Sequence, residues 1–218
     1  MTGFSNSPRI VKGGLVLVDA DSSSVKRVIA LQYNPDTLSR RLQPQQMNAD
    51  AEQSEALRLR GPAVETITLE AEIDASDQLE FPDQHRSVVE LGIAPQLAVL
   101  EGMINPTSAD LLANNNLANS GTLEIAPMES ALTLFVWGAN RIVPVIVTEF
   151  SITEEAFDTA LNPIRARVSL GMRVLSVDDL GFDHRGGSLF MSYLQAREQF
   201  ASKAASVGFD TLGIGGIQ

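Results

Sequence analysis

The side chains with the greatest chemical potential in this sequence are two histidines and a few acidic clusters. His184 lies close in sequence to Asp178, Asp179 and Asp183, and imidazole and carboxylate groups are common metal ligands. This spacing alone is a weak signal for a metal site, so a solvated acidic turn is the interpretation that we favour. His85 lies in a distant part of the chain, and the sequence gives no reason to pair it with His184.

Two further patterns match catalytic or cofactor motifs only in part. Glu154 and Glu155 are adjacent carboxylates, but acid–base catalysis needs a cleft that places two carboxyl groups in different environments. They follow a predicted strand in a polar stretch, so we expect a solvated turn. The "GIGG" run at 213–216 has no strand before it, which a dinucleotide-binding fingerprint requires. The usual zinc-protease, serine-hydrolase and phosphate-loop motifs are also missing, so we expect no enzyme, no cofactor and no metal.

The composition narrows the class of protein. The chain has 218 residues, no cysteine and a formal net charge of −11. A chain without cysteine forms no disulfides, which fits a reducing cytoplasm, and a negative surface repels phosphate backbones, so we expect no nucleic-acid partner. Residues 1–14 lack the apolar run of a signal peptide, and no stretch approaches the roughly 20 apolar residues of a membrane span. We therefore expect a cytoplasmic protein that does not insert into a membrane.

Alternation of apolar and polar residues predicts a β-rich fold, mainly β with α. Residues 14–33 hold two strand-like runs around a small polar turn, which is typical of a hairpin. Residues 65–74 and 164–174 alternate with a period of two, which marks half-buried antiparallel strands. Two more strand-like runs flank Gly138-Ala139-Asn140, a short hairpin connection.

Three residues, Asn34, Pro35 and Asp36, form a predicted corner between two strands. Proline has no N–H for a strand ladder and biases Asn34 toward extended geometry, and Asp36 can hydrogen-bond its own backbone in a turn. We expect an architectural role for this corner. Pro144, inside a later strand-like run, predicts an edge position, a bulge or a subunit boundary.

Helical spacing occurs in two places. The first is a predicted helix over about 94–104, and residues 107–121, which are rich in Asn and Ser, predict a loop after it. Residues 154–163 predict a connection with some helical character, and residues 177–187 a polar, glycine-rich linker. The second helix is expected over 188–205, before an apolar, glycine-rich tail. Its predicted N-cap is Ser188, and its apolar side consists of Leu189, Tyr193, Leu194, Phe200, Ala201 and Ala204.

Four more residues are candidates for contacts. Trp137 is the only tryptophan and stands at a strand end beside a glycine, where a packing anchor is favoured over a ligand platform. Arg165, Arg167 and Arg173 share one strand face. This stripe can meet the acidic face of a neighbouring subunit, and an ordinary exposed strand face is the alternative.

Four segments, taken in order, carry a resemblance to a known family: "LQYNPDTLSR", "EIDASDQLE", "VVELGIAPQLAVLEGMINP" and "LTLFVWGANRIVPVIVTEFSITEEAFDTALNPIRARVSLGMRVL". Together they resemble the tube-type baseplate protein of contractile injection systems, the phage-tail-like particles that bacteria assemble in their cytoplasm. The similarity covers about residues 9–178. The last segment is its most specific part, and "QYNP" is the next.

This resemblance implies an antiparallel β-barrel or rolled sandwich with one helix packed on it, assembled as a six-membered ring. The implied partners are further copies of the chain, the inner tube protein, the spike protein and other baseplate subunits. Such a ring stacks between the spike and the first tube layer, adapts one symmetry to the other and starts tube assembly. It is a structural component, not an enzyme.

Family members often carry a C-terminal LysM module, and residues 179–218 offer a linker, a helix and a glycine-rich tail instead. We therefore predict a tube-like domain over 1–178 and a docking extension over 179–218 that contacts another baseplate subunit. Three alternatives stay open: the main inner tube subunit, a cargo-binding module that uses the Asn-rich segment and the C-terminal helix, and a cell-wall hydrolase.

Overall fold

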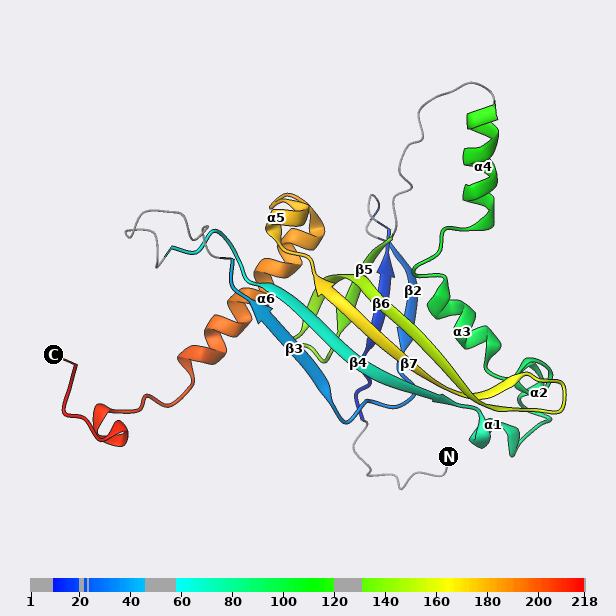
Figure 1. Ribbon diagram of the computed structural model, residues 1–218, viewed down its shortest axis with the longest axis horizontal. Helices are drawn as coiled ribbons and strands as arrows, with labels where there is room; N and C mark the ends of the chain where they lie inside the picture. Colours follow the sequence, from blue (N-terminus) through cyan, green and yellow to red (C-terminus); the bar gives the residue numbers. More distant parts are fainter. Residues whose placement is uncertain (1–9, 20–21, 23, 46–57, 120–130, 218) are drawn as a thin grey trace.

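The protein is built on one seven-stranded antiparallel sheet with several helices, which makes it a mixed α/β protein (Figure 1). The computed structural model describes residues 10–19, 22, 24–45, 58–119 and 131–217. The strands are β1 (Gly14–Val18), β2 (Val25–Ala30), β3 (Leu38–Gln43), β4 (Val64–Asp74), β5 (Leu132–Val136), β6 (Ile142–Phe157) and β7 (Pro163–Val174). The helices are α1 (Ser76–Leu79), α2 (Arg86–Leu91), α3 (Ala94–Glu101), α4 (Ser108–Asn119), α5 (Val177–Leu180) and α6 (Arg185–Ser202), followed by a 3-10 turn, η2 (Phe209–Leu212). In this described part, no helix is both long and apolar enough to cross a membrane.

The strand order is β2-β1-β5-β6-β7-β4-β3, with every neighbouring pair antiparallel. The predicted hairpins β1–β2 and β5–β6 are confirmed. In the second hairpin, Gly138 has a φ of 75°, and the Trp137 N–H donates to the Arg141 carbonyl at 2.8 Å. A positive φ suits glycine, because glycine has no Cβ to clash with the backbone.

Strand β6 is 16 residues long and connects the two parts of the sheet. Its first residues pair with β5, and the rest pair with β7. Pro144 lies in this central strand opposite Leu134, so the predicted edge position is wrong. Its carbonyl accepts from Leu175 N–H at 2.9 Å. The N–H that proline lacks would also point toward Leu175, one residue beyond Val174, where the β6–β7 pairing begins. Pro144 therefore removes no hydrogen bond from within that pairing.

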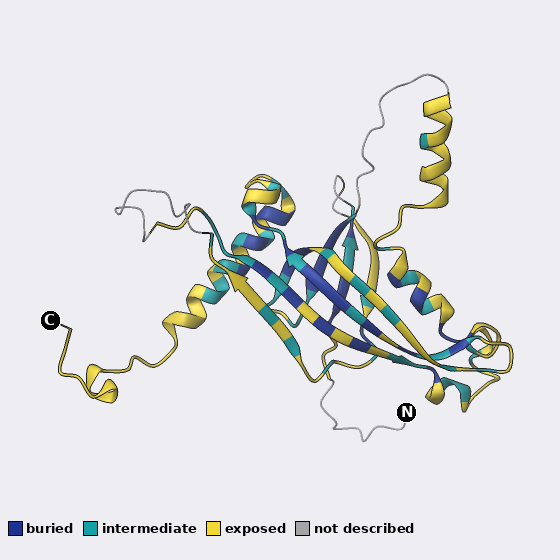
Figure 2. Ribbon diagram, viewed as in Figure 1, coloured by how far each residue is buried: buried dark blue, intermediate teal, exposed yellow. Residues whose placement is uncertain are grey.

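One face of the sheet is apolar and forms the core. The predicted alternation in β4 and β7 is confirmed. Figure 2 shows buried residues alternating with exposed or half-buried residues along β4, and mainly with half-buried residues along β7. Helix α3 covers part of this core with Leu97 and Leu100, and α6 adds Phe190 and Tyr193 to it. Residues from the β1–β5 side and the β4–β7 side, such as Leu15 and Ile67, belong to the same cluster. The sheet therefore curls so that its two parts pack on each other.

One side chain links the segment after β2 to the end of β4, but the outer strands of the sheet, β2 and β3, are not paired with each other. Gln32, just after β2, donates from Nε2 to the Asp74 carbonyl at 2.6 Å and accepts at Oε1 from the Asp74 N–H at 3.0 Å. Strands β2 and β3 remain the outer strands of the order among the described residues. The sheet is not closed into a barrel, and the structure also has more helices than the single packed helix and C-terminal helix that we expected.

The segment after α3 is a helix where the sequence predicted a loop. Helix α4 begins at Ser108, directly after Thr107, whose Oγ1 accepts from the Asp110 N–H at 3.1 Å and donates to the Asp110 carboxylate at 2.6 Å. This pair caps the helix start. The loop prediction was wrong because the abundance of Asn outweighed the capping signal. The last residues of the predicted loop, 120–121, lie outside the described part of the chain. Residues 46–57, which belong to a polar segment before β4, also lie outside it.

The connection after β6 is also shorter than predicted. Strand β6 continues to Phe157, so the expected helical character at 154–163 is wrong, and Glu154 and Glu155 lie on a strand and not in a turn. The turn itself is fixed by Asp158, whose Oδ1 accepts from the backbone N–H groups of Ala160 and Asn162 at 2.7 and 2.8 Å.

The predicted linker at 177–187 contains α5 and the start of α6. The N-cap of α6 is His184, not Ser188: His184 Nδ1 accepts from the Gly186 N–H at 3.0 Å. A Cβ at Gly187 would overlap the Gly181 carbonyl oxygen, and one at Gly186 would overlap the Leu180 side chain. The two glycines therefore allow α5 and α6 to approach closely, so they mark a tight contact and not a flexible linker.

Candidate assembly surfaces

The Asn-Pro-Asp corner lies between β2 and β3, as expected, and its asparagine has a structural function. Asn34 accepts from the Gly13 N–H at 2.8 Å and donates to the Val11 carbonyl at 2.9 Å. It thereby ties the corner to the chain that enters β1. Pro35 and Asp36 line a shallow hollow on the surface, together with residues of β4 and β7.

The outer face of β6, β7 and β4 is polar over three neighbouring strands. The register places Thr153, Arg167 and Glu72 in one row across the strands. The next row holds Ser151, Ser169 and Glu70. Acidic side chains of β4 and a basic side chain of β7 thus lie side by side on this surface, which we call the polar face.

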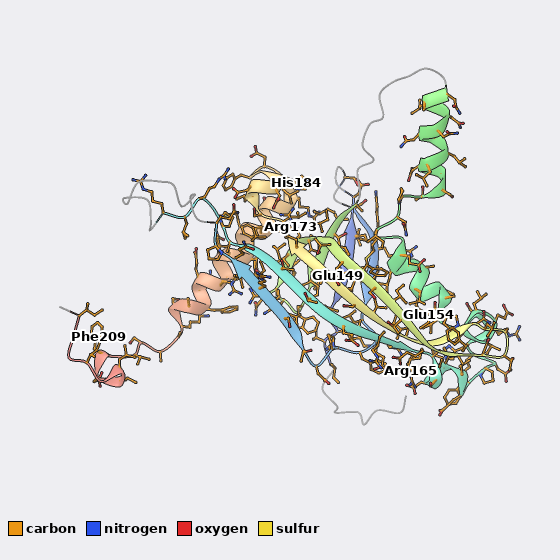
Figure 3. The ribbon with its side chains drawn as sticks, in the orientation of Figure 1. Glu149, Glu154, Arg165, Arg173, His184 and Phe209 are labelled. Carbon is orange, nitrogen blue, oxygen red and sulfur yellow. The ribbon has the colours of Figure 1, made fainter. Side chains whose placement is uncertain are left out.

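The arginine stripe of β7 is paired within the chain. Arg165 Nε lies 2.7 Å from Asp74 Oδ2, Arg167 lies 2.6 Å from Glu155 Oε1, and Arg173 lies 2.8 Å from Asp179 Oδ1. Arg165 and Arg173 lie toward opposite ends of β7 (Figure 3). These contacts fit the alternative of an exposed strand face, because each arginine has a carboxylate from its own chain.

Two of these carboxylates are held in the ionised form. Burial raises the pKa of Asp74, but hydrogen bonds from Ser76 and Arg165 outweigh it and hold the pKa below its ordinary value. Burial likewise raises the pKa of Asp179, and hydrogen bonds from the Ser176 backbone and Arg173 lower it further than burial raises it. Both ends of the stripe therefore remain paired in mildly acidic solution.

Trp137 is a packing residue. Its ring stacks on Phe135 with centroids 5.8 Å apart. A Cβ at Gly13 would overlap the indole ring, so the indole lies directly on the backbone that enters β1. The ring is therefore occupied by its own chain and does not form an open ligand platform.

The first half of α6 is held by a buried polar network. Tyr193 is 6% exposed and Glu65 of β4 is 5% exposed. The tyrosine hydroxyl donates to Glu65 Oε2 at 3.2 Å and accepts from Arg40 at 2.7 Å and from Arg197 at 3.2 Å. Arg40 Nε also lies 2.5 Å from Glu65 Oε1. Burial and then the Glu65 charge raise the pKa of Tyr193.

The predicted apolar residues of α6 have three different environments. Tyr193 is buried in the network, and Leu189 packs partly buried against a small cluster of Val18, Leu132 and Leu134. Phe200 is 50% exposed. The first half of α6 thus belongs to the body of the protein, and only its second half is open to a partner.

Sequence reasoning missed Arg40, Glu65, Gln32 and Phe190. A signal for Glu65 was present: it shares the parity of Ile67, Leu69 and Ala71, which alternation places on the buried face. A carboxylate on that face needs a partner. Its partners, Arg40 and Tyr193, could be named only once the strand order was known.

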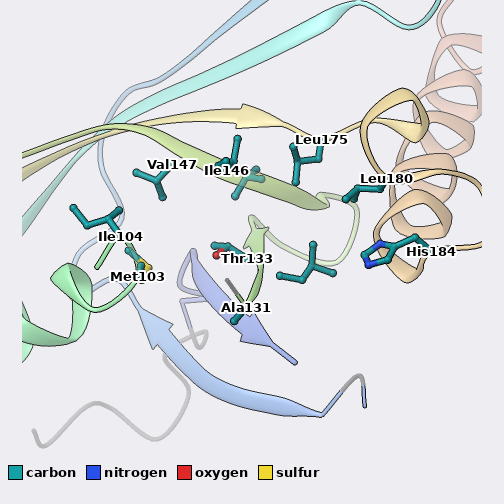
Figure 4. A pocket seen from close by; sticks show the side chains of 11 residues that line it. Met103, Ile104, Ala131, Thr133, Ile146, Val147, Leu175, Leu180 and His184 are labelled. Atoms are coloured by element: carbon teal, nitrogen blue, oxygen red, sulfur yellow. The ribbon is translucent and has the colours of Figure 1, made fainter. Parts of the chain in front are cut away.

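A hollow of about 350 Å³ lies beside His184, at the junction of β5, β6 and α5 (Figure 4). Among the described residues its lining is mostly apolar, and His184 is the one titratable residue of that described lining. His184 already uses Nδ1 to cap α6. Across the described residues, no group of three or more His, Asp or Glu side chains could hold a metal ion. The described residues of the hollow therefore supply a single histidine and no second titratable group beside it.

The fold and these surfaces define a mixed α/β protein with one open antiparallel sheet, a polar sheet face and a partly exposed C-terminal arm. No protein-family model matches the chain, and no curated protein matches it either.

Proposed function

We propose that this chain is a structural subunit of a phage-tail-like contractile injection system, a baseplate ring protein that joins the spike to the inner tube and nucleates tube assembly. The observation that carries the proposal is the antiparallel sheet with a polar face and two open edges, β2 and β3, in the described part of the chain. The resemblance of residues 9–178 to the tube-type baseplate family supports the same role.

The open edges explain why the chain would work in a ring. An unpaired edge strand presents free backbone groups that another strand can use. Strand β2 is exposed along most of its length, with Val25 59% and Val28 66% exposed. Neighbours in a closed ring satisfy such edges and complete a barrel-like wall that one chain leaves open. Six copies is the number that the family resemblance implies.

The polar face suits the inside of that ring. A tube that delivers cargo needs a water-filled channel whose wall does not retain apolar cargo. The rows that contain Glu72, Arg167 and Thr153 supply such a wall, because their charges are balanced by pairs such as Arg167 with Glu155. The completed ring would then present a rim that the tube protein can copy.

Electron microscopy of particles from cells that lack this protein tests the proposal. The expected result is spikes without attached tubes, restored by the wild-type gene. Normal tubes joined to normal spikes would contradict it. Counting copies in each wild-type particle separates two roles with the same fold: the ring subunit gives one ring, and the main inner tube subunit gives many.

A second candidate is a cargo-binding module, and helix α4 favours it. The helix extends away from the sheet (Figure 1) and exposes Leu111 and Leu112. A pull-down with the purified chain distinguishes the candidates: a ring protein recovers tube and spike proteins, whereas a cargo module recovers effectors. Replacing Leu111 and Leu112 with serine should abolish only the second result.

A further inference from the structure

The far end of the β6–β7 hairpin carries a fixed apolar surface, which we call the apolar tip: Val89, Leu91, Phe157 and Leu161. All four side chains are between 44% and 78% exposed. The hairpin is bound by two hydrogen bonds, one to α2 and one to the residue that precedes α3. Asn162 Nδ2 donates to the Glu90 carbonyl at 3.0 Å, and the Ile93 N–H donates to the Pro163 carbonyl at 2.8 Å. The tip is therefore preformed and does not need a partner to order it.

Leu161 is the most unusual residue of the tip. Its φ is 65°, the only positive φ of a non-glycine residue in the described chain, and its side chain is 78% exposed. This backbone region disfavours leucine and is much easier for asparagine or glycine. The protein's own core makes little use of the side chain. Strain held at an exposed apolar residue points to a contact outside the chain.

A second apolar surface lies beyond the buried half of α6. We call it the apolar arm: Phe200, Val207, Phe209, Leu212, Ile214 and Ile217. Each of these side chains is at least 44% exposed. The tail has its own turn, because the Ile214 N–H donates to the Phe209 carbonyl at 3.2 Å and Gly213 adopts a φ of 72°. The arm presents a defined shape that its own chain leaves uncovered.

The arm and the tip lie at opposite ends of the longest axis of the molecule (Figure 1), and Phe209 is far from Arg165 near the hairpin (Figure 3). They cannot meet within one copy. We propose that the apolar arm of one copy packs against the apolar tip of the next copy, in a repeated head-to-tail contact. Such contacts close into a ring when their rotation closes. The inference rests on the proposed function, because it adds a second contact between neighbouring ring subunits to the one that their open strand edges make.

Charge favours this pairing over contact between two tips. Residues 76–92, around the tip, contain four carboxylates and one arginine. Two tips brought together would place like charges face to face, which weakens association. Residues 194–217 of the arm contain two charges of each sign, and Lys203 lies one helical turn from Phe200. The arm can therefore approach the acidic tip without net repulsion.

Because the chain has no cysteine, disulfide trapping tests the contact directly. Full-length Leu161→Cys and Phe209→Cys chains are mixed, oxidised and separated on a non-reducing gel, with mass spectrometry to identify each pair. The expected result is a mixed disulfide at a yield about tenfold above that of control pairs, because the contact raises the effective thiol concentration. The matched control is Leu111→Cys, an exposed leucine of α4, mixed with Phe209→Cys.

Light scattering on the same samples separates the possible failures. Rings that form without mixed disulfides above the control level, or that trap only two arms, would overturn the arm–tip contact and leave the ring proposal standing. A chain that stays monomeric even with tube and spike proteins present would overturn both the arm–tip contact and the ring proposal.

Leu161→Asn provides a second readout. It relieves backbone strain, so we expect an unchanged or higher melting temperature and about tenfold weaker self-association, and wild-type association would contradict the inference.

Discussion

Removing one hydroxyl group, in Tyr193→Phe, should measurably destabilise the protein. The hydroxyl joins Glu65, Arg40 and Arg197, and both Tyr193 and Glu65 are buried. A hydrogen bond to a charged group contributes about 1.5–3 kcal/mol. Glu65 keeps its contact with Arg40 in the variant, so we expect a loss of unfolding free energy of about 1.5–3 kcal/mol. For a chain of this length, that loss lowers the melting temperature by about 3–12 °C.

Urea unfolding followed by Trp137 fluorescence measures this loss, because the only tryptophan lies beside the core of the sheet. The matched control is Tyr33→Phe, since Tyr33 is the only other tyrosine and is 46% exposed. It should change the unfolding free energy by less than about 0.5 kcal/mol. Amide exchange should also become faster over residues 185–193 in Tyr193→Phe only.

A Tyr193→Phe variant as stable as the Tyr33→Phe control would refute this reasoning. It would mean that the polar network does not hold α6 on β4. Faster exchange throughout the sheet, with no local change in α6, would contradict the reasoning in another way, because the network would then stabilise the whole fold and not the docking of α6.

Three more predictions concern pH and backbone geometry. The pKa of Tyr193 is raised, so the unfolded chain ionises first: stability falls as pH rises above the ordinary value of about 10, and urea titrations should show a smaller fall in Tyr193→Phe. The pKa of Asp74 is lowered, so its contribution is present above about pH 4 and is lost as pH falls through the folded value; acid unfolding of Asp74→Asn should lack that part of the pH dependence. Gly138→Ala, at a φ of 75° with open space around the new Cβ, should cost about 1–2 kcal/mol in thermal unfolding. Gly92→Ala should cost clearly more than about 2 kcal/mol, because φ is 57° and a Cβ there would also overlap the Pro163 carbonyl oxygen. Equal costs for the two variants would contradict the steric argument.

Local sequence patterns predicted the individual strands well, because a period of two and a short turn depend only on neighbouring residues. Strand β4 and the hairpin between β5 and β6 are examples. The strand order was not predictable in this way. Strand β4 pairs with β7, which is far away in the sequence, and no local pattern records that pairing.

The candidate surfaces also had a part that local sequence predicted and a part that depends on strand order. The shared face of Arg165, Arg167 and Arg173 followed from alternation, but their carboxylate partners depend on which strands lie beside β7. Glycine was the most misleading residue. At Gly186 and Gly187 it indicated a linker by composition, whereas the structure uses it for close packing of α5 and α6.

The length of β6 has a mechanical consequence. Sixteen residues of extended chain span about 50 Å, and a single strand therefore runs from the pairing with β5 to the turn at Asp158. Irregularities in its pairing with β7 occur near Val147 and near Ala156, but the pairing with β7 continues along the chain before and after the first of them. A push or pull on the hairpin end is thus carried along one continuous strand, paired with β7 over most of its length, and reaches the opposite part of the sheet without crossing a loop.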